Sequence, residues 1–172
     1  MKYSLTTLFL LLSIIVYAQQ TPPWKSHKTA NYQIQYPSEW TLELGKQNTE
    51  FFLMTALESN SDNFKENINL MIQDLKGMNM NLDSYTGLSE GQIKDNLANG
   101  KIIESTRVKN KIRSYHKIIY QGDTNGYTLK WLQHYWVIQD KAYVLTFTAE
   151  ASSYDQYIAT VLKIFESFKI AY

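Results

Sequence analysis

The chain has 172 residues, no cysteine and a formal net charge of +1. The absence of cysteine excludes disulfides, thiol catalysis, cysteine-ligated zinc or iron–sulfur centres and a lipid-anchored N-terminal cysteine. The near-zero charge provides no basic patch, so neither nucleic acid nor an anionic membrane surface is expected as a partner. With 44% hydrophobic residues, the length suits one domain that buries a core without covalent staples.

Residues 1–18 have the pattern of a secretory signal peptide. Lys2 supplies the positive start, residues 5–17 are mainly apolar, and Val16 and Ala18 occupy the two positions that a signal peptidase reads. The apolar run is shorter than the roughly 20 residues that a membrane span needs. We therefore expect cleavage after Ala18 and an exported protein, periplasmic or secreted, with no stable membrane insertion. Removal of Lys2 leaves the mature chain formally neutral.

The first half of the mature chain is predicted to be mainly extended. Residues 19–30 contain two adjacent prolines and no periodicity, so they are expected to form a lead-in segment. Apolar residues alternate over 32–36 and again over 40–44, as in strands with one buried face. Two further strands are predicted in the segments 50–57 and 67–75.

Apolar spacing then changes to that of a helix over 82–97. Asn81 is a plausible N-cap and Gly100 a C-terminal stop, while Gly87 and Gly91 weaken the helix by about 1 kcal/mol each relative to alanine. This helix must therefore be stabilised by packing rather than by propensity. Extended patterning returns in two segments, 101–108 and 112–121.

The most regular pattern is a long β-hairpin over residues 127–150, predicted to turn at Asp140-Lys141 with Gln139 opposite Ala142. One face of the hairpin is almost wholly apolar and carries Leu132, His134, Trp136 and Ile138 with Tyr143, Leu145, Phe147 and Ala149. The other face is amphipathic and carries Trp131, Gln133, Tyr135 and Val137. We expect other parts of the protein to cover both faces of the hairpin, at least in part.

A second helix is predicted to follow the hairpin. Ser153 and Gln156 fit a capping box, and an apolar stripe continues to Phe168. The predicted class is α+β: a central antiparallel sheet flanked by helices, in a single domain over residues 31–172.

Three segments together resemble the PsbP-like family. They are Tyr32-x-Ile-x-Tyr-Pro-x-x-Trp40, then Glu66-Asn-Ile-Asn-Leu70, and finally the run from Asp140 to Ala149 before a helix that closes on Ser167-Phe168. The resemblance implies an α-β-α sandwich, shared with the yeast Ran-binding nuclear-import factor and with DcrB-type bacterial envelope proteins. It also implies a binding or assembly protein rather than an enzyme. Because partners differ across this fold, it names none here and transfers no functional residue.

A metal site is one alternative that the residues themselves suggest. If Gln121 pairs with Tyr127, His116 and His134 lie diagonally on one face of neighbouring strands, where two imidazoles could bind zinc or copper weakly. No third ligand stands at short spacing, so two core histidines are the more ordinary interpretation and no cofactor is predicted.

No catalytic motif is present: the sequence lacks Gly-x-Ser-x-Gly, a phosphate-binding loop and Gly-x-Gly-x-x-Gly. A surplus of aromatic residues, with 13 Tyr, 7 Phe and 4 Trp, indicates a packed sheet or an exposed ring platform. On the amphipathic hairpin face, Trp131, Gln133 and Tyr135 are the predicted contact surface. A basic run from Arg107 to Arg113 is expected to be a solvated turn.

The sequence therefore predicts an exported, non-catalytic binding or assembly module of the cell envelope, whose partner is an unknown envelope or secreted protein. The alternatives are an envelope protein that binds a small ligand or metal, and a hydrolase whose site is hidden in the sequence. An exposed apolar patch would favour the first, a ring-lined pocket the second, and converging titratable groups the third.

Overall fold

The computed structural model describes residues 23–109 and 113–171; the predicted signal peptide and its cleavage site lie outside them. These residues form two antiparallel sheets and two helices, which confirms the predicted α+β class. The strands are β1 (Trp24–Lys28), β2 (Tyr32–Pro37), β3 (Thr41–Leu44), β4 (Phe51–Met54), β5 (Asn67–Asp74), β6 (Ala98–Val108), β7 (Tyr115–Thr124), β8 (Tyr127–Ile138), β9 (Lys141–Glu150) and β10 (Lys169–Ile170). The helices are α1 (Leu82–Asn96) and α2 (Tyr154–Ser167).

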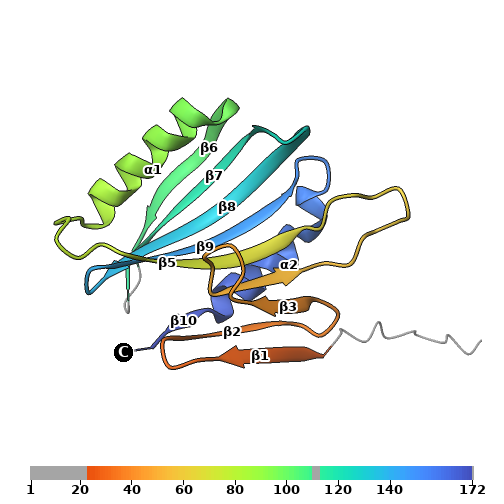
Figure 1. Cartoon of the computed structure of the whole chain (residues 1–172), viewed down its shortest axis with the longest axis horizontal. Coiled ribbons are helices and arrows are strands. Elements are labelled where there is room, and N and C mark those ends of the chain that lie inside the picture. The colour runs from red at the N-terminus through yellow and green to blue at the C-terminus, as the bar shows by residue number, and fades with distance from the viewer. Residues whose placement is uncertain (1–22, 110–112, 172) are drawn as a thin grey trace, which may run out of the picture.

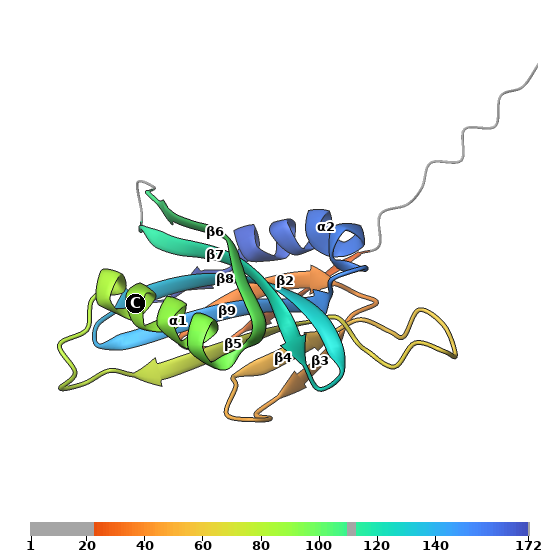
Figure 2. The ribbon, with the colours of Figure 1, turned by 90° about the horizontal axis from the view of Figure 1, so that it is seen from above.

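The larger sheet has the strand order β3-β4-β5-β9-β8-β7-β6 and separates the two helices (Figures 1 and 2). Helix α1 covers β6, β7 and β8 on one face, and α2 lies against β9 and β2 on the other. Because side chains alternate between the faces of a strand, the central strands β8 and β9 contribute to two cores. Phe147 and Leu132 belong to the core under α2, and Tyr135 and Val144 to the core under α1.

A second, three-stranded sheet, β1-β2-β10, lies beside α2 and was not predicted (Figure 1). The prediction of an irregular lead-in is wrong from Trp24 onward, because β1 pairs with β2 from Trp24↔Pro37 to Lys28↔Gln33. The side chains of β1 are mostly exposed, so burial imposes no alternation that the sequence could reveal. Backbone pairing with β2, not side-chain pattern, makes this segment a strand.

The hairpin that joins β8 to β9 turns one residue earlier than predicted. Gln139 and Asp140 are the two loop residues, with φ of 48° and 57°, and Ile138 pairs with Lys141. This backbone is that of a type I′ turn, which matches the twist of the strands. Moving the turn by one residue shifts the cross-strand partners by two, so both predicted faces are retained although the predicted pairs are wrong.

The hairpin between β7 and β8 also differs from the prediction. Its loop is Asn125-Gly126, with φ of 52° and 84°, and Thr124 pairs with Tyr127. Asn-Gly is the strongest short-range signal for a two-residue hairpin, and the predicted pairing of Gln121 with Tyr127 overlooked it. The predicted Gln121–Tyr127 pair is therefore wrong, because the strand partner of Tyr127 is three residues further along β7. A shift of the register by an odd number of residues exchanges the faces of one strand relative to the other.

The same substitution at two glycines should change stability in opposite directions. At Gly126 an added Cβ meets no atom within 4 Å, so the only penalty of Gly126→Ala is the strain of an alanine at positive φ. We expect the free energy of unfolding to fall by about 1 kcal/mol. At Gly87, inside α1, there is also open space, and Gly87→Ala should stabilise by about 1 kcal/mol through helix propensity. Urea denaturation of both variants measures the difference; two shifts of the same sign would contradict it.

The N-terminus of α1 is capped as predicted, and that of α2 is not. The Asn81 side chain accepts hydrogen bonds from the backbone N–H groups of Asp83 and Ser84, and the Ser84 hydroxyl accepts one from the Asn81 N–H. Ser153 occupies the N-cap of α2 but makes no side-chain cap bond, so the predicted capping box is absent. Within residues 23–109 and 113–171, neither helix has the length and apolar content to cross a bilayer.

Candidate functional site

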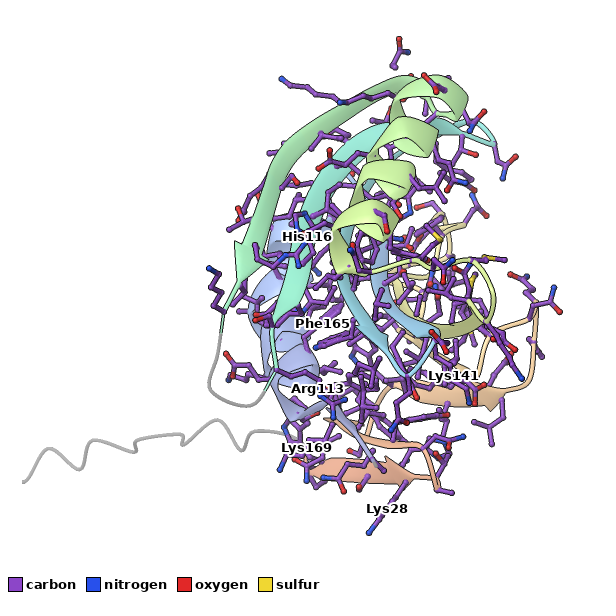
Figure 3. The ribbon with its side chains drawn as sticks, turned by 90° about the vertical axis from the view of Figure 1, so that its left-hand side faces the viewer. Lys28, Arg113, His116, Lys141, Phe165 and Lys169 are labelled. Carbon is purple, nitrogen blue, oxygen red and sulfur yellow. The ribbon has the colours of Figure 1, made fainter. Side chains whose placement is uncertain are left out.

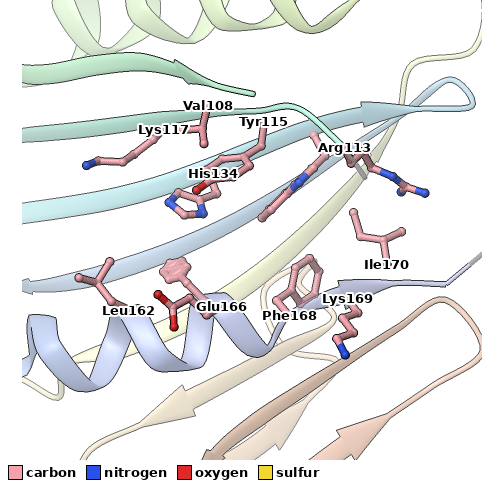
Figure 4. Close-up of a pocket in the computed structure, with 12 residues that line it drawn as sticks. Val108, Arg113, Tyr115, Lys117, His134, Leu162, Glu166, Phe168, Lys169 and Ile170 are labelled. Carbon is pink, nitrogen blue, oxygen red and sulfur yellow. The ribbon is translucent and has the colours of Figure 1, made fainter. Parts of the chain in front are cut away.

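A cavity of about 650 Å³ lies between α2 and the strand ends of β6, β7 and β8 (Figure 4). We call it the α2 cavity. Its walls are mainly aromatic and aliphatic side chains, with four charged groups and one imidazole among them. The lining residues are Val108, Arg113, Tyr115, Lys117, His134, Trp136, Leu162, Phe165, Glu166, Phe168, Lys169 and Ile170. This volume is within the range of small-molecule sites.

Aromatic rings enclose His134 at the base of the α2 cavity. Its imidazole centroid lies 4.4 Å from that of Tyr115, 4.9 Å from that of Phe165 and 5.7 Å from that of Trp136. A further ring, Phe168, packs against Trp136 at 5.3 Å. Period-two alternation places His134 and Trp136 on this face of β8, and helical spacing places Phe165 opposite them on α2.

Burial keeps this imidazole neutral. His134 is 6% exposed, and loss of hydration, aided by the positive charge of Lys117, lowers its pKa to about 3. Its Nε2 atom is buried and has no hydrogen-bond partner among the described residues. A buried polar atom left unsatisfied costs about 1 to 3 kcal/mol, so a ligand group that entered far enough to reach Nε2 would recover that energy.

The rim of the α2 cavity carries more positive than negative charge. Arg113, Lys117 and Lys169 line it together with one acid, Glu166. The Lys117 ammonium lies 2.9 Å from a Glu104 carboxylate oxygen and is therefore partly neutralised. Arg113 was predicted to belong to a solvated turn, and its role in lining a cavity could not be inferred because the cavity closes only when α2 packs on the sheet.

The two histidines predicted as a metal pair lie on opposite faces of the sheet. His116 pairs with Tyr135, whereas His134 pairs with Lys117, so their side chains point away from each other. Figure 3 shows His116 near α1 and Phe165, a ring neighbour of His134, on α2. They cannot share a metal ion, and the described residues contain no group of three or more His, Asp or Glu that could hold one. The predicted pairing failed because it depended on the wrong β7–β8 register.

Instead, His116 joins Ser105 and Glu90 in a hydrogen-bonded chain under α1. The Ser105 Oγ lies 2.8 Å from His116 Nε2 and in contact with a Glu90 carboxylate oxygen. Because a carboxylate only accepts, the serine donates to Glu90, and His116 Nε2–H donates to the serine. A nucleophilic serine needs the reverse arrangement, in which the serine hydroxyl donates its proton to an imidazole and an acid orients that imidazole through Nδ1. Here His116 Nδ1 has no partner among the described residues, so the Glu90–Ser105–His116 hydrogen bonds lack that geometry.

The predicted contact surface is not an exposed platform. Tyr135 is 2% exposed because α1 covers it, with the Tyr85 ring edge-on at 5.6 Å. Trp131 and Gln133 are half-buried, and Trp131 stacks on Tyr120 at 4.9 Å. Tyr135 is therefore not available as an exposed contact ring, whereas Trp131 and Gln133 remain partly accessible. All three residues instead line a second hollow, of about 410 Å³, between α1 and the sheet, which we call the α1 groove.

No protein-family model matches the sequence, and no curated protein matches it. Solved structures do match, and they define the class of fold. The chain is similar to the cyanobacterial PsbP of Synechocystis sp. PCC 6803, with 10% identity, a TM-score of 0.63, and coverage of 92% of this chain and 98% of that one. The predicted PsbP-like fold is thus confirmed.

Two further structures have similar extent. LpqN, involved in cell envelope biogenesis of Mycobacterium tuberculosis, matches at 15% identity and a TM-score of 0.66, covering 87% of this chain and 92% of that one. PA94 of Pseudomonas aeruginosa, a protein of unknown function, matches at 10% identity and a TM-score of 0.58, covering 84% and 94%. At these identities the similarity concerns the fold alone.

Proposed function

We propose that this protein is an exported, non-catalytic binding module of the cell envelope that holds a small amphipathic ligand in the α2 cavity. The observation that carries the proposal is a ring-lined cavity of about 650 Å³ whose lining includes His134, the imidazole with an unpartnered Nε2. Apolar walls with a few placed polar groups are typical of small-molecule sites. The predicted signal peptide and the similarity to LpqN support the location.

The chemistry of the walls indicates the kind of ligand. Trp136, Phe165 and Phe168 would bury an apolar body, while a hydroxyl or acid group could bond to the neutral imidazole of His134. The excess of positive charge at the rim favours an acid over an amine. A protein partner in the envelope stays a prediction.

Filling the α2 cavity should abolish ligand uptake without unfolding the protein. Leu162 lines the cavity and is 41% exposed, so Leu162→Trp places a large ring in the cavity from a tolerant helix position. With the neutral dye N-phenyl-1-naphthylamine as probe, we expect at least a tenfold loss of affinity, equal to about 1.4 kcal/mol. Decanoic acid and decanol should both displace the dye from the parent protein.

Leu88→Trp is the matched control, because Leu88 is a 51% exposed leucine on α1, outside both hollows. It should bind the dye as the parent does. Equal affinity of the Leu162→Trp variant and the parent, or no dye uptake by the parent, would refute the proposed site.

A further inference from the structure

The α1 groove has an unusual lining. Four aromatic rings and four carboxamides dominate it, and none of its thirteen described lining residues is charged. About one residue in five of the whole chain is charged, so this is a selectively uncharged polar surface. The rings belong to Tyr85, Tyr120, Trp131 and Tyr135, and the carboxamides to Gln73, Gln92, Asn96 and Gln133.

The rings and amides of the groove are held in place by one another. The Trp131 ring stacks on Tyr120 with an interplanar angle of 15°. The Tyr85 hydroxyl donates to Gln73 Oε1 at 2.5 Å, the Tyr135 hydroxyl donates to Gln133 Oε1, and Gln133 Nε2 donates to Thr146 Oγ1 at 3.0 Å. These bonds orient the carboxamides of Gln73 and Gln133 while leaving each with further bonding capacity, because an amide has two N–H donors and two lone pairs. The groove is therefore pre-organised rather than collapsed.

On α1, Gln92 and Asn96 are exposed and lie at the opposite wall from Trp131. They are four residues apart, so they share one face of the helix. The helix thus supplies one ring and two carboxamides to the groove, and the strands supply the other three rings and two carboxamides. The groove lies on the face of the sheet opposite the α2 cavity.

We propose that the α1 groove binds a neutral saccharide. Sugar rings present apolar C–H faces, which pack on an accessible aromatic ring, and in this groove that ring is the half-buried Trp131, since Tyr85, Tyr120 and Tyr135 are buried behind it. The sugar hydroxyl groups both donate and accept hydrogen bonds, which carboxamides satisfy. A phosphate or sulfate ligand would need cations that the groove does not have. A purely apolar chain would leave the carboxamides desolvated without partners. This site is independent of the α2 cavity and of the function proposed for it.

The test is a titration of the mature protein, residues 19–172, with short neutral oligosaccharides of glucose, mannose, xylose and N-acetylglucosamine at millimolar concentrations. Backbone amide NMR shifts locate any binding. We expect at least one sugar to shift the amides of residues 92–97 and 131–135, and a glucuronic-acid oligomer to bind more weakly. Trp131→Ala should lose at least tenfold in affinity. Because Trp131 also packs on Tyr120, a second variant separates binding from folding: Gln92→Trp blocks the groove from an exposed helix position and should lose binding as well.

Leu162→Trp, in the other cavity, is the control and should bind the sugar as the parent does. The proposal is overturned if no sugar of the panel shifts the groove amides, or if the Gln92→Trp variant binds as tightly as the parent. Displacement of sugar by the α2 cavity dye would also contradict it, because the two sites lie on opposite faces.

Discussion

Acidification from about pH 7 to about pH 3 should cost this protein roughly 5 kcal/mol through His134 alone. Burial lowers the pKa of its imidazole from 6.5 to about 3 in the folded state. Between these two values the unfolded chain binds the proton and the folded chain does not. The contribution is therefore fully present above pH 6.5, is lost as the pH falls toward about 3, and is constant below that.

His134→Phe removes the titrating group while retaining a ring of similar shape among Tyr115, Trp136 and Phe165. We expect the free energy of unfolding of this variant, measured by urea denaturation, to decline much less on acidification than that of the parent. A smaller decline in the same direction should persist, because burial, and then the positive charge of Arg107, also lowers the pKa of His116.

Tyr115→Phe is the control for the His134 experiment, since it preserves the ring 4.4 Å from the imidazole and leaves the histidine in place. It should retain the acid dependence of the parent. If His134→Phe and the parent lost stability in parallel as the pH fell, the imidazole would not be buried and neutral in the folded protein.

Phe147→Ala should destabilise the fold by about 3 to 5 kcal/mol, because it leaves a phenyl-sized hole in the larger core. Phe147 is 0% exposed and stands opposite Ile68 of β5 and Leu132 of β8. Its ring also packs on Tyr154 of α2, with centroids 5.4 Å apart. One side chain therefore joins the centre of the sheet to the helix that closes the α2 cavity.

The matched control is Leu44→Ala, which removes an apolar side chain from a strand where it is 56% exposed. Its effect should stay within about 0.5 kcal/mol. Urea denaturation and thermal unfolding measure both variants. A comparable loss in the two would mean that Phe147 does not occupy the packed core.

Local periodicity of apolar residues was sufficient to predict most of the helices and strands. Alternation along residues 127–150 predicted which side chains share the apolar face, and this assignment survived a misplaced turn because the error moved the partners by an even number. The same dependence of the faces on register made the predicted histidine pair wrong. An error of three residues at the β7–β8 turn is odd, so it placed His116 on the wrong face. Asn125-Gly126 was the signal that could have corrected it.

Only part of each candidate site could be read from the sequence: His134 for the α2 cavity, and Trp131, Gln133 and Tyr135 for the α1 groove. The α2 cavity combines Arg113, His134 and Phe165, which belong to three segments that meet only after α2 packs on the sheet. The α1 groove unites Gln92 of α1 with Trp131 of β8 and Gln73 of β5 in the same way. Composition predicted a surplus of rings but not whether α1 would cover them, and α1 covered Tyr135 while leaving Trp131 half-buried.

By itself, the sequence determined the α+β class, the two helices, the strands of the larger sheet and the inward faces of its central hairpin. These follow from interactions between residues close in the chain: the period of burial, capping groups and turn residues. The tertiary structure decided the small β1-β2-β10 sheet, the register between β7 and β8, and the two hollows. Those features depend on contacts between distant segments, and no local pattern encodes which distant segments meet.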